Sequence, residues 1–312
     1  MRIAIIDLGT NTFNLLIAEV FADNSYKTIY KNKIATKLGE GGINLGVILP
    51  VPFQRGLDAL RQHQEIIAKF GAEKVYAFAT SAIRSASNGE EFVMRAKQDI
   101  GIDISIITGN REAELIYYGV RNAVKMDKSC SLIMDIGGGS TEFIFANKDT
   151  ILWQHSFQLG AARLMEKFNP SDPMTHEEVL ALKKYLKKEL QPLFEAAKTH
   201  TASQLIGSSG SFDSLAEMIA HRFHDIDVLK DKTEFPLNLE ESNAIYHDLL
   251  KSTRQERLNM KGLIELRVDM IVVSAIFVHL ILTSMHISSM RLSTYSLKEG
   301  ALWELLHPAK VS

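Results

Sequence analysis

The sequence predicts an α/β protein of two related domains. Three observations lead to this prediction: strand and helix patterns alternate, a strand–acid–turn–strand motif occurs twice, and 312 residues suffice for about two domains. The composition is 46% hydrophobic with a formal net charge of −2, which supplies apolar side chains for two cores. It excludes a disordered chain, and it argues against binding to nucleic acid or to a membrane through a broadly basic surface.

The first third of the chain alternates β-branched runs with amphipathic stretches, which is typical of α/β architecture. A glycine-rich loop at 39–42 precedes the first amphipathic stretch. We expect strands and helices in the order strand 2–6, strand 13–20, helix 53–70, strand 75–79, strand 102–107 and helix 112–124.

The second half begins in the same way and then becomes rich in helices. The most apolar stretch, 270–282, is interrupted by Ser274 and His279 and is too short to span a bilayer, so we expect a buried core helix there. We expect strands at 131–136, 141–146, 204–206 and 290–292, and helices at 180–194, 239–254, 265–285 and 297–306.

The most informative feature is an internal repeat. Residues 6–17 and 134–145 each predict a buried strand ending in an acid (Asp7 or Asp135), a turn rich in Gly, Ser, Thr and Asn, and a second apolar strand. One such turn would indicate only a tight β-hairpin. Two copies with the acid in register favour a phosphate site, because these turns expose N–H groups and hydroxyls that bind anions. We expect the two hairpins to face each other across a cleft.

The cysteine content and the N-terminus bear on the compartment. Cys130 is the single cysteine, so no intramolecular disulfide can form. The first strand reaches Asp7 too early for the apolar region of a secretory signal. We therefore expect a cytoplasmic protein with no membrane attachment.

A series of motifs runs along the chain at Asp7–Thr12, Leu38–Gly42, Thr80–Arg84, Gly109–Ala113, Asp135–Glu142, Gly207–Gly210 and Arg267–Asp269. Together these motifs resemble the exopolyphosphatase/guanosine pentaphosphate phosphohydrolase family, whose members have a duplicated actin-like (ribonuclease H-like) fold with mixed sheets flanked by helices. They occur in the family's order and cover essentially the whole chain. Thr10 and Thr12 stand where the family usually has Ser, and Ser293–Ser296 departs from the usual Ser-Asp/Tyr-Gly pattern.

The resemblance implies two actin-like domains with an active-site cleft between them. The first would comprise 1–120 with about 298–312, and the second 121–297 with helical insertions. The additional C-terminal helical domains of longer members are expected to be absent, which puts processivity on long chains in doubt.

The resemblance places the catalytic glutamate of the family on Glu112, which would activate the attacking water. The alternative is an acid that only complements the dipole of its helix. Glu114 would point to a different side of that helix. Arg84 would close over the phosphate and stabilise transition-state charge, unless it is an ordinary surface arginine.

Two further groups of residues would hold metal and phosphate. Asp135 and Glu142 border one turn and suit Mg²⁺, or another divalent ion such as Mn²⁺, with Asp7 as a matching acid from the other domain. Turn-capping carboxylates are the alternative. Lys37, Arg254, Arg257, Lys261 and Arg267 could line a channel for a polyanion, but scattered basic side chains are usually solvated, and we interpret them as solvated. Phosphate-binding N–H and hydroxyl groups are expected from Thr10, Asn11, Thr12, Gly137, Gly138, Ser140, Thr141, Ser208, Ser209 and Gly210.

The activity that this resemblance implies is Mg²⁺-dependent release of terminal orthophosphate from inorganic polyphosphate, with short chains preferred. The closest alternative is hydrolysis of the 5′-terminal phosphate of guanosine pentaphosphate by the same residues. A kinase of the same superfold and a non-catalytic polyphosphate- or nucleotide-binding regulator are weaker alternatives. A homodimer is expected from the family alone.

Overall fold

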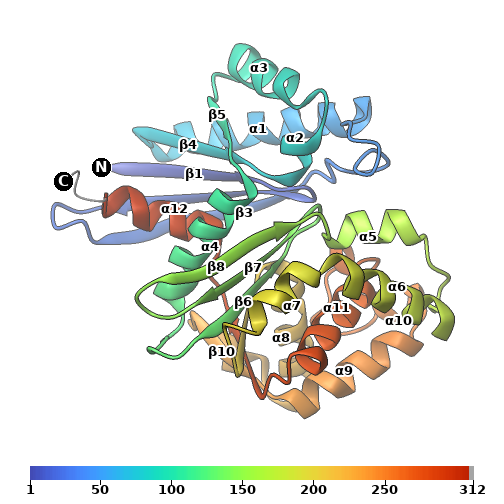
Figure 1. Cartoon of the computed structure of the whole chain (residues 1–312). Coiled ribbons are helices and arrows are strands. Elements are labelled where there is room, and N and C mark those ends of the chain that lie inside the picture. The colour runs from blue at the N-terminus through green and yellow to red at the C-terminus, as the bar shows by residue number, and fades with distance from the viewer. Residues whose placement is uncertain (309–312) are drawn as a thin grey trace. The chain divides into compact units, whose positions relative to one another are not determined.

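The computed structural model describes residues 1–308 and divides the chain into two compact units (Figure 1). Unit 1 comprises Met1–Gly119 and the C-terminal segment that begins at Leu297, and unit 2 comprises Val120–Ser296. The sequence-based boundaries were expected after residues 120 and 297. Residues 309–312 of the expected segment 298–312 lie outside the described residues.

Unit 1 is built on a five-stranded mixed sheet of order β3-β2-β1-β4-β5. β1–β2 and β2–β3 are antiparallel, whereas β1–β4 and β4–β5 are parallel. In Figure 1, α1 and α3 cover one face of this sheet and α12 covers the other. The elements are β1 (Arg2–Leu8), β2 (Thr12–Val20), β3 (Tyr26–Ala35), α1 (Pro50–Phe70), β4 (Lys74–Ala79), α2 (Ser81–Ser85), α3 (Gly89–Ile100), β5 (Ile104–Ile106), α4 (Gly109–Ala123) and α12 (Leu297–Leu306).

Unit 2 is built on a six-stranded mixed sheet of order β10-β11-β9-β6-β7-β8. Its strands are β6 (Ser131–Ile136), β7 (Thr141–Ala146), β8 (Ile151–Phe157), β9 (Gln204–Ser208), β10 (Glu234–Leu237) and β11 (Ser289–Ser293). Its helices are α5 (Ala161–Phe168), α6 (His176–Glu189), α7 (Gln191–Ala197), α8 (Ser209–Phe223), α9 (Leu239–Lys251), α10 (Arg254–Leu258) and α11 (Ile271–Ser284), with 3₁₀ turns η1 (Ile226–Leu229) and η2 (Glu265–Arg267).

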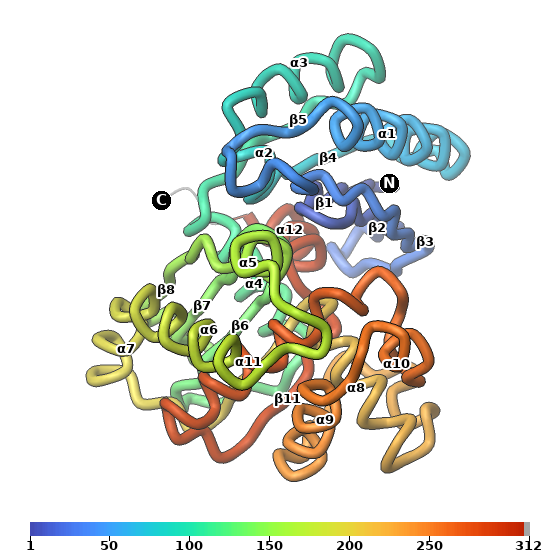
Figure 2. Tube along the Cα trace, turned by 90° about the vertical axis from the view of Figure 1, so that its right-hand side faces the viewer, coloured from blue at the N-terminus to red at the C-terminus, as the bar shows by residue number. Residues whose placement is uncertain are grey.

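The most apolar stretch of the sequence forms α11, which is buried within unit 2. It packs against α5, α6, α8 and α9, and Figure 2 shows it among α6, α8 and α9. A helix buried on every side needs no polar face, which explains why α11 lacks amphipathic periodicity. Among residues 1–308, the structure contains no helix long and apolar enough to cross a membrane.

The two sheets repeat one topology, and this confirms the predicted duplicated α/β fold. Three antiparallel strands followed by two parallel ones give β3-β2-β1-β4-β5 in unit 1 and β8-β7-β6-β9-β11 in unit 2. The hairpin turns also close alike. Gly9 N–H donates to Thr12 O at 3.0 Å, and Gly137 N–H donates to Ser140 O at 3.0 Å. The sequence repeat is therefore a repeat of structure down to single hydrogen bonds.

The expected helices of unit 2 are divided more finely than the sequence pattern indicates. The single helix expected at 180–194 is wrong, because α6 ends at Glu189 and α7 begins at Gln191 with Pro192 in its first turn. The helix expected at 265–285 is also wrong, because η2 ends at Arg267 and α11 begins at Ile271. Thr253 starts α10 with a capping box, so the helix expected at 239–254 is two helices.

Candidate active site

The parallel strands of unit 1 bring the predicted catalytic residues to one edge of its sheet. Leu8 of β1 pairs with Ala79 of β4, which pairs with Ile106 of β5, so these strands end together. The hairpin turn, α2 and α4 follow directly after these three strand ends. Side chains that start such connections meet at the carboxyl edge of a parallel sheet. Arg84 on α2 and Glu112 on α4 lie at this edge.

Arg84 and Glu112 form a partly buried ion pair at this edge. Arg84 Nη1 lies 2.8 Å from Glu112 Oε2 and also donates to Ile107 O at 3.0 Å. Glu112 is only 8% exposed, although it occupies the first turn of α4. An acid that served only the helix dipole would not need to be buried next to a guanidinium partner. The structure thus brings together the predicted base and the predicted phosphate-binding arginine.

Glu114 belongs to a separate network, as expected from its different helix face. It pairs with Arg111 at 2.6 Å and accepts a hydrogen bond from the Tyr118 hydroxyl at 3.1 Å. Arg111 is also bound by Glu304 of α12. These contacts fasten α12 to α4 within unit 1.

The hairpin turn of unit 1 is buried and braced from outside. Thr10, Asn11 and Thr12 are at most 8% exposed. The N–H groups of Thr36 and Lys37 donate to Asn11 O at 2.9 and 3.0 Å. Next to the turn, Asn14 lies opposite Asp7 and donates to its Oδ2 at 3.1 Å. The turn therefore has a fixed backbone beside one carboxylate.

The edge of the sheet in unit 2 collects hydroxyl groups on a single carboxylate oxygen. Asp135 Oδ2 accepts hydrogen bonds from the hydroxyls of Ser208 at 2.6 Å, Ser209 at 2.7 Å and Ser296 at 2.7 Å. Ser208 is in register with Asp135 across β6 and β9, and Ser296 follows β11. Ser296 is a site neighbour that the sequence reasoning missed, because it appeared only as a departure from the family pattern.

A second buried carboxylate lies directly opposite Asp135. Glu142 is its partner in the β6–β7 ladder, is 1% exposed, and accepts a hydrogen bond from Ser156 Oγ at 2.6 Å. Neighbouring carboxylates on one sheet face are a donor set that fits Mg²⁺, which uses one or two carboxylates together with phosphate oxygens. Among residues 1–308, however, no three His, Cys, Asp or Glu side chains gather into a metal cluster.

The turn of unit 2 is held from behind by α5. Ala161 N–H donates to Gly137 O at 2.9 Å, and Arg163 Nε donates to Gly139 O at 2.9 Å. A Cβ atom on Gly160 would lie 2.3 Å from the Gly138 carbonyl carbon, so only glycine allows this approach. The first turn of α5 therefore fixes the backbone of Gly137–Gly139.

Two expected phosphate donors are used inside the protein. Gly137 N–H closes the hairpin turn onto Ser140 O, and the Thr141 hydroxyl donates to Leu159 O at 3.0 Å. The expected phosphate contacts of Gly137, Gly138, Ser140 and Thr141 stay a prediction.

The turn from β9 into α8 shows backbone strain and a close cation. Ser209 has a φ of 69°, a left-handed conformation that costs energy in a residue other than glycine and is often found at functional sites. At the next residue, a Cβ atom on Gly210 would lie only 1.8 Å from Arg267 Nη2. The guanidinium of Arg267 therefore occupies the space above Gly210.

Arg267 is a buried cation, not the solvated side chain that the sequence suggested. It is 8% exposed, and its Nε has no hydrogen-bond partner within residues 1–308. Burial lowers the pKa of Arg267, while the charges of Asp213 and Asp135 oppose this effect. A buried guanidinium with an unsatisfied donor is costly unless a ligand completes its contacts.

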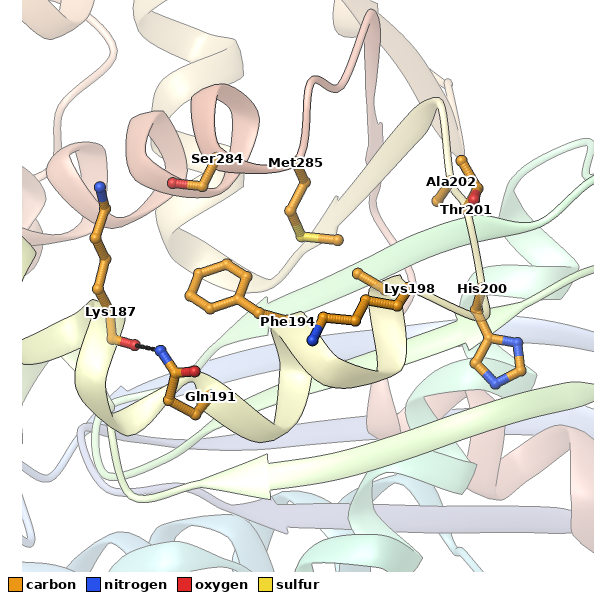
Figure 3. Close-up of a pocket in the computed structure, with 10 residues that line it drawn as sticks. Lys187, Gln191, Phe194, Lys198, His200, Thr201, Ala202, Ser284 and Met285 are labelled. Atoms are coloured by element: carbon orange, nitrogen blue, oxygen red, sulfur yellow. Dashed lines mark hydrogen bonds between the residues drawn. The ribbon is translucent and has the colours of Figure 1, made fainter.

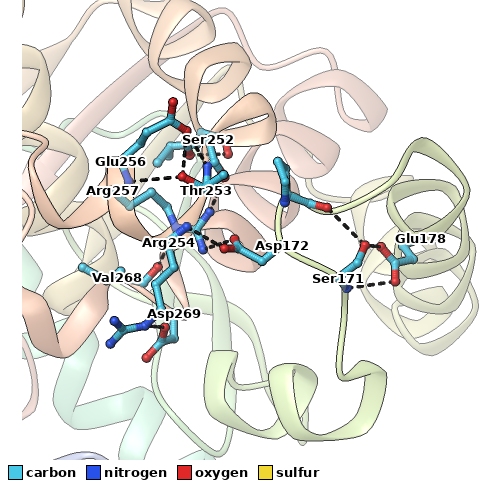
Figure 4. A network of polar contacts seen from close by, with 12 residues as sticks. Ser171, Asp172, Glu178, Ser252, Thr253, Arg254, Glu256, Arg257, Val268 and Asp269 are labelled. Carbon is cyan, nitrogen blue, oxygen red and sulfur yellow. Dashed lines mark hydrogen bonds and ion pairs between the residues drawn. The ribbon is translucent and has the colours of Figure 1, made fainter.

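Arg257 is likewise buried, at 6% exposure, and this also corrects its interpretation as solvated. Figure 4 shows it in a network with Asp172 and the carbonyl of Val268. Arg254, in contrast, is an exposed residue that pairs with Asp269 at 2.8 Å. Arg254 and Arg257, only three residues apart, thus differ in burial and in their partners.

Unit 2 also has an open pocket that none of the expected site residues lines. Figure 3 shows it between α7 and the C-terminal end of α11, with a volume of about 540 Å³. Phe194 and Met285 form its apolar part, and Lys187 and Lys198 lie at its rim. Lys198 is already paired with Glu195 at 2.6 Å. We assign no ligand to this pocket.

Comparison with known proteins identifies the family. The model of the Ppx/GppA phosphatase family matches residues 16–309. The chain belongs to this family. A crystal structure described as an exopolyphosphatase from Cytophaga hutchinsonii has 42% identity and a TM-score of 0.96, with all of both chains covered. The Aquifex aeolicus PPX-GPPA enzyme has 26% identity and a TM-score of 0.79, covering 97% of this chain and 98% of that one.

Two curated relatives of the chain are also described as an exopolyphosphatase or as a phosphatase. A putative exopolyphosphatase of Haemophilus influenzae is 28% identical over 97% of this chain and 91% of its own length. The bifunctional 3-dehydroquinate synthase/phosphatase of Fusobacterium nucleatum is 34% identical over 67% of this chain, which matches only 32% of that longer protein. The similarity to the Haemophilus influenzae protein extends over nearly the full length of both chains.

Proposed function

We propose that this protein is an exopolyphosphatase, which hydrolyses the terminal phosphoanhydride bond of inorganic polyphosphate and prefers short chains. The single observation that carries the proposal is the partly buried ion pair of Glu112 and Arg84, with 2.8 Å between Oε2 and Nη1, in a chain of the Ppx/GppA family. The name of the Cytophaga hutchinsonii relative, 42% identical over the full length, supports the choice of substrate.

In the proposed reaction, Glu112 accepts a proton from a water molecule. The water oxygen forms a bond to the terminal phosphorus, and the bond from that phosphorus to the bridging oxygen breaks. Orthophosphate and a shortened chain leave. Arg84, which already contacts Glu112, would face the equatorial oxygens of the phosphoryl group and stabilise the charge that develops there.

The turns of both units would bind the phosphates of the substrate. Their N–H groups and hydroxyls can donate to phosphate oxygens without requiring a basic surface. Arg267 adds one buried cation beside Gly210. The proposed binding residues are Thr10, Asn11, Thr12, Gly138, Ser140, Ser208, Ser209, Gly210 and Arg267.

Asp135 and Glu142 would hold a magnesium ion, with Asp7 of unit 1 as a further acid. Two buried carboxylates in one strand pair are the observation that supports this assignment. When bound, the ion would supply positive charge to phosphate oxygens. The three serine hydroxyls orient Asp135 and leave the second oxygen of its carboxylate outside these hydrogen bonds.

The alternative substrate is guanosine pentaphosphate, cleaved at its 5′-terminal phosphate by the same residues. The family model supports it, since the family name joins both activities. The test measures orthophosphate release side by side from polyphosphates of graded length, guanosine pentaphosphate and ATP, with and without Mg²⁺. We expect Mg²⁺-dependent release with the highest kcat/KM on short polyphosphates. Faster release from guanosine pentaphosphate would favour the alternative, and tight binding without release would indicate a regulator.

The cytoplasmic location and the homodimer stay predictions. Light scattering during size-exclusion chromatography measures the mass in solution directly. A dimer corresponds to about twice the chain mass of 34.9 kDa. A mass equal to one chain would contradict the dimer.

A further inference from the structure

Arg257 is the most completely hydrogen-bonded arginine in the segment that precedes Arg267. Its Nε donates to Val268 O at 3.0 Å, and its Nη1 donates to Ser252 O at 2.5 Å. Its Nη2 lies 2.8 Å from Asp172 Oδ1 (Figure 4). With a 6% exposed guanidinium fixed in three directions, Arg257 joins three separate backbone segments.

Asp172, the acidic partner, is itself held in place. Its Oδ2 accepts a hydrogen bond from Arg254 N–H at 2.7 Å. The preceding residue, Ser171, is bound through its N–H and its hydroxyl to the Glu178 carboxylate at 3.0 and 2.6 Å. Burial alone would raise the pKa of Asp172, but the hydrogen bonds and charges of Arg254 and Arg257 lower it below its ordinary value. The ion pair therefore persists at neutral pH.

The Val268 carbonyl is the point where this network meets the candidate active site. Val268 follows Arg267 at the end of η2, a 3₁₀ turn of only three residues, Glu265–Arg267. A short turn of this kind has few hydrogen bonds of its own. Arg267 must nevertheless keep its guanidinium above Gly210, where a Cβ atom would lie 1.8 Å from Nη2.

We propose that Arg257, held by Asp172, is a positioning residue for Arg267. It fixes the Val268 carbonyl and so orders the turn that presents Arg267 to Ser209 and Gly210. Arg257 does not contact the substrate and acts only through Arg267. The inference rests on the proposed function, in which Arg267 binds phosphate, and a displacement of about 1 Å at such a group can cost about 10²-fold in rate.

The first test is structural and does not depend on activity. Hydrogen exchange of the backbone amides at 265–270 is compared in the full-length protein, R257Q, D172N and R254Q. The variant R254Q is the matched control, because it removes the exposed pair with Asp269 but leaves the Arg257 contacts. We expect faster exchange in R257Q and D172N, and exchange at the wild-type rate in R254Q. Unchanged exchange in both R257Q and D172N would overturn the proposal.

The second test is a double-mutant cycle on kcat/KM for tripolyphosphate, with R257Q, R267Q and the double variant, each corrected for its folded fraction by circular dichroism. We expect R257Q to lower kcat/KM by about 10²-fold and to have no further effect once Arg267 is gone. R257K should recover only part of the loss, since an ammonium cannot hold three acceptors in a plane. Independent, multiplying losses would show that Arg257 does not act through Arg267.

Different results would refute the proposed function and the positioning role of Arg257. A wild-type protein that releases no phosphate from any of the substrates would refute the proposed function, while hydrogen exchange would still decide whether Arg257 orders η2. Wild-type kcat/KM in R267Q would refute the role of Arg267, and with it the functional meaning of Arg257. If R257Q does not fold, D172N, whose replaced carboxylate is 43% exposed, supplies the same comparison.

Discussion

The hairpins β1–β2 and β6–β7 share one backbone and differ in chemistry. Both turns close with the same hydrogen bond, from Gly9 to Thr12 and from Gly137 to Ser140. Opposite Asp7 stands an amide, Asn14, which donates to the carboxylate. Opposite Asp135 stands a second carboxylate, Glu142. The copy in unit 1 therefore places one acid opposite an amide, whereas the copy in unit 2 places two acids opposite each other, a concentration of negative charge that suits a divalent cation.

The side chains supplied by the parallel strands and their connections also differ between the two units. In unit 1, the connections after β4 and β5 supply an arginine and a glutamate, Arg84 and Glu112. In unit 2, those after β9 and β11 supply hydroxyls on Asp135, from Ser208, Ser209 and Ser296. The two copies of the duplicated fold therefore carry different functional groups, and we propose proton transfer for unit 1 and metal binding for unit 2.

The largest effect should come from removing the proposed base. We expect Glu112→Gln to fold normally and to lower kcat on tripolyphosphate by about 10²- to 10⁴-fold, since an amide cannot accept the proton of the water. Glu114→Gln, two positions along the same helix, is the control and should keep nearly the wild-type kcat because its contacts are to Arg111 and Tyr118. Equal losses in both variants would mean that only the integrity of α4 matters.

The next largest effect should separate the two aspartates. We expect Asp135→Asn to lower Mg²⁺-dependent hydrolysis by about 10²-fold or more, because loss of a metal ligand should exceed the 10- to 100-fold cost of losing a supporting residue. Asp7→Asn should lower it less, since Asp7 stands opposite an amide and not opposite a second carboxylate. Initial rates at saturating Mg²⁺ measure both. A larger loss in Asp7→Asn would reverse the assignment of the metal to unit 2.

The residues opposite the aspartates should differ in their effect on metal affinity. Glu142→Gln is expected to raise the Mg²⁺ concentration for half-maximal rate by at least about ten-fold, because one of the two proposed ligand carboxylates is lost. Asn14→Ala should leave that concentration unchanged. Titration of the rate with Mg²⁺ at fixed tripolyphosphate compares them. A shift of equal size in Asn14→Ala would contradict the division between the hairpins.

The smallest effect concerns stability toward acid. Unit 1 contains a buried histidine, His63, and unit 2 contains a partly buried one, His279. Burial lowers the pKa of His63 in unit 1, and burial together with Lys183 and His247 lowers that of His279 in unit 2 to about 4. Since the unfolded side chains titrate near 6.5, unfolding takes up protons and stability should fall as the pH drops from about 6.5 toward 4. Urea unfolding at pH 7.5 and 5 should show a smaller loss in His279→Gln than in wild type, and an equal loss would exclude this contribution.

The sequence predicted those parts of the molecule that depend on local pattern or on repeated motifs. The two hairpins, the sheet strands that bear them and the positions of Arg84 and Glu112 in connections all follow from periodicity and motif order. The pairing of Arg84 with Glu112 does not, because it depends on the parallel register of β4 and β5. The sequence pattern could not show this register, since it is set by contacts between distant segments.

Burial of single charged residues was the main property that the sequence could not reveal. Arg257 and Arg267 are buried, whereas the nearby Arg254 is exposed. Arg267 lies on η2, which packs against α8, and Arg257 is bonded to Asp172 and to the Val268 carbonyl, so distant contacts determine their burial. The internal bonds of Gly137 and Thr141 were hidden for a similar reason, since a donor in a motif does not show which acceptor it reaches. Ser296 lay outside the family pattern and is identified only by its 2.7 Å hydrogen bond to Asp135.

In the proposed reaction, water attacks the terminal phosphorus of the polyphosphate. Hydrolysis of tripolyphosphate in water enriched in oxygen-18, followed by mass spectrometry of both products, tests this most directly. For this reaction we expect one oxygen-18 atom in the released orthophosphate and none in the pyrophosphate. The Glu112→Gln variant should form the labelled orthophosphate far more slowly. Label in the pyrophosphate would place the attack on the internal phosphorus and contradict the account, as would formation of labelled orthophosphate at the wild-type rate by Glu112→Gln.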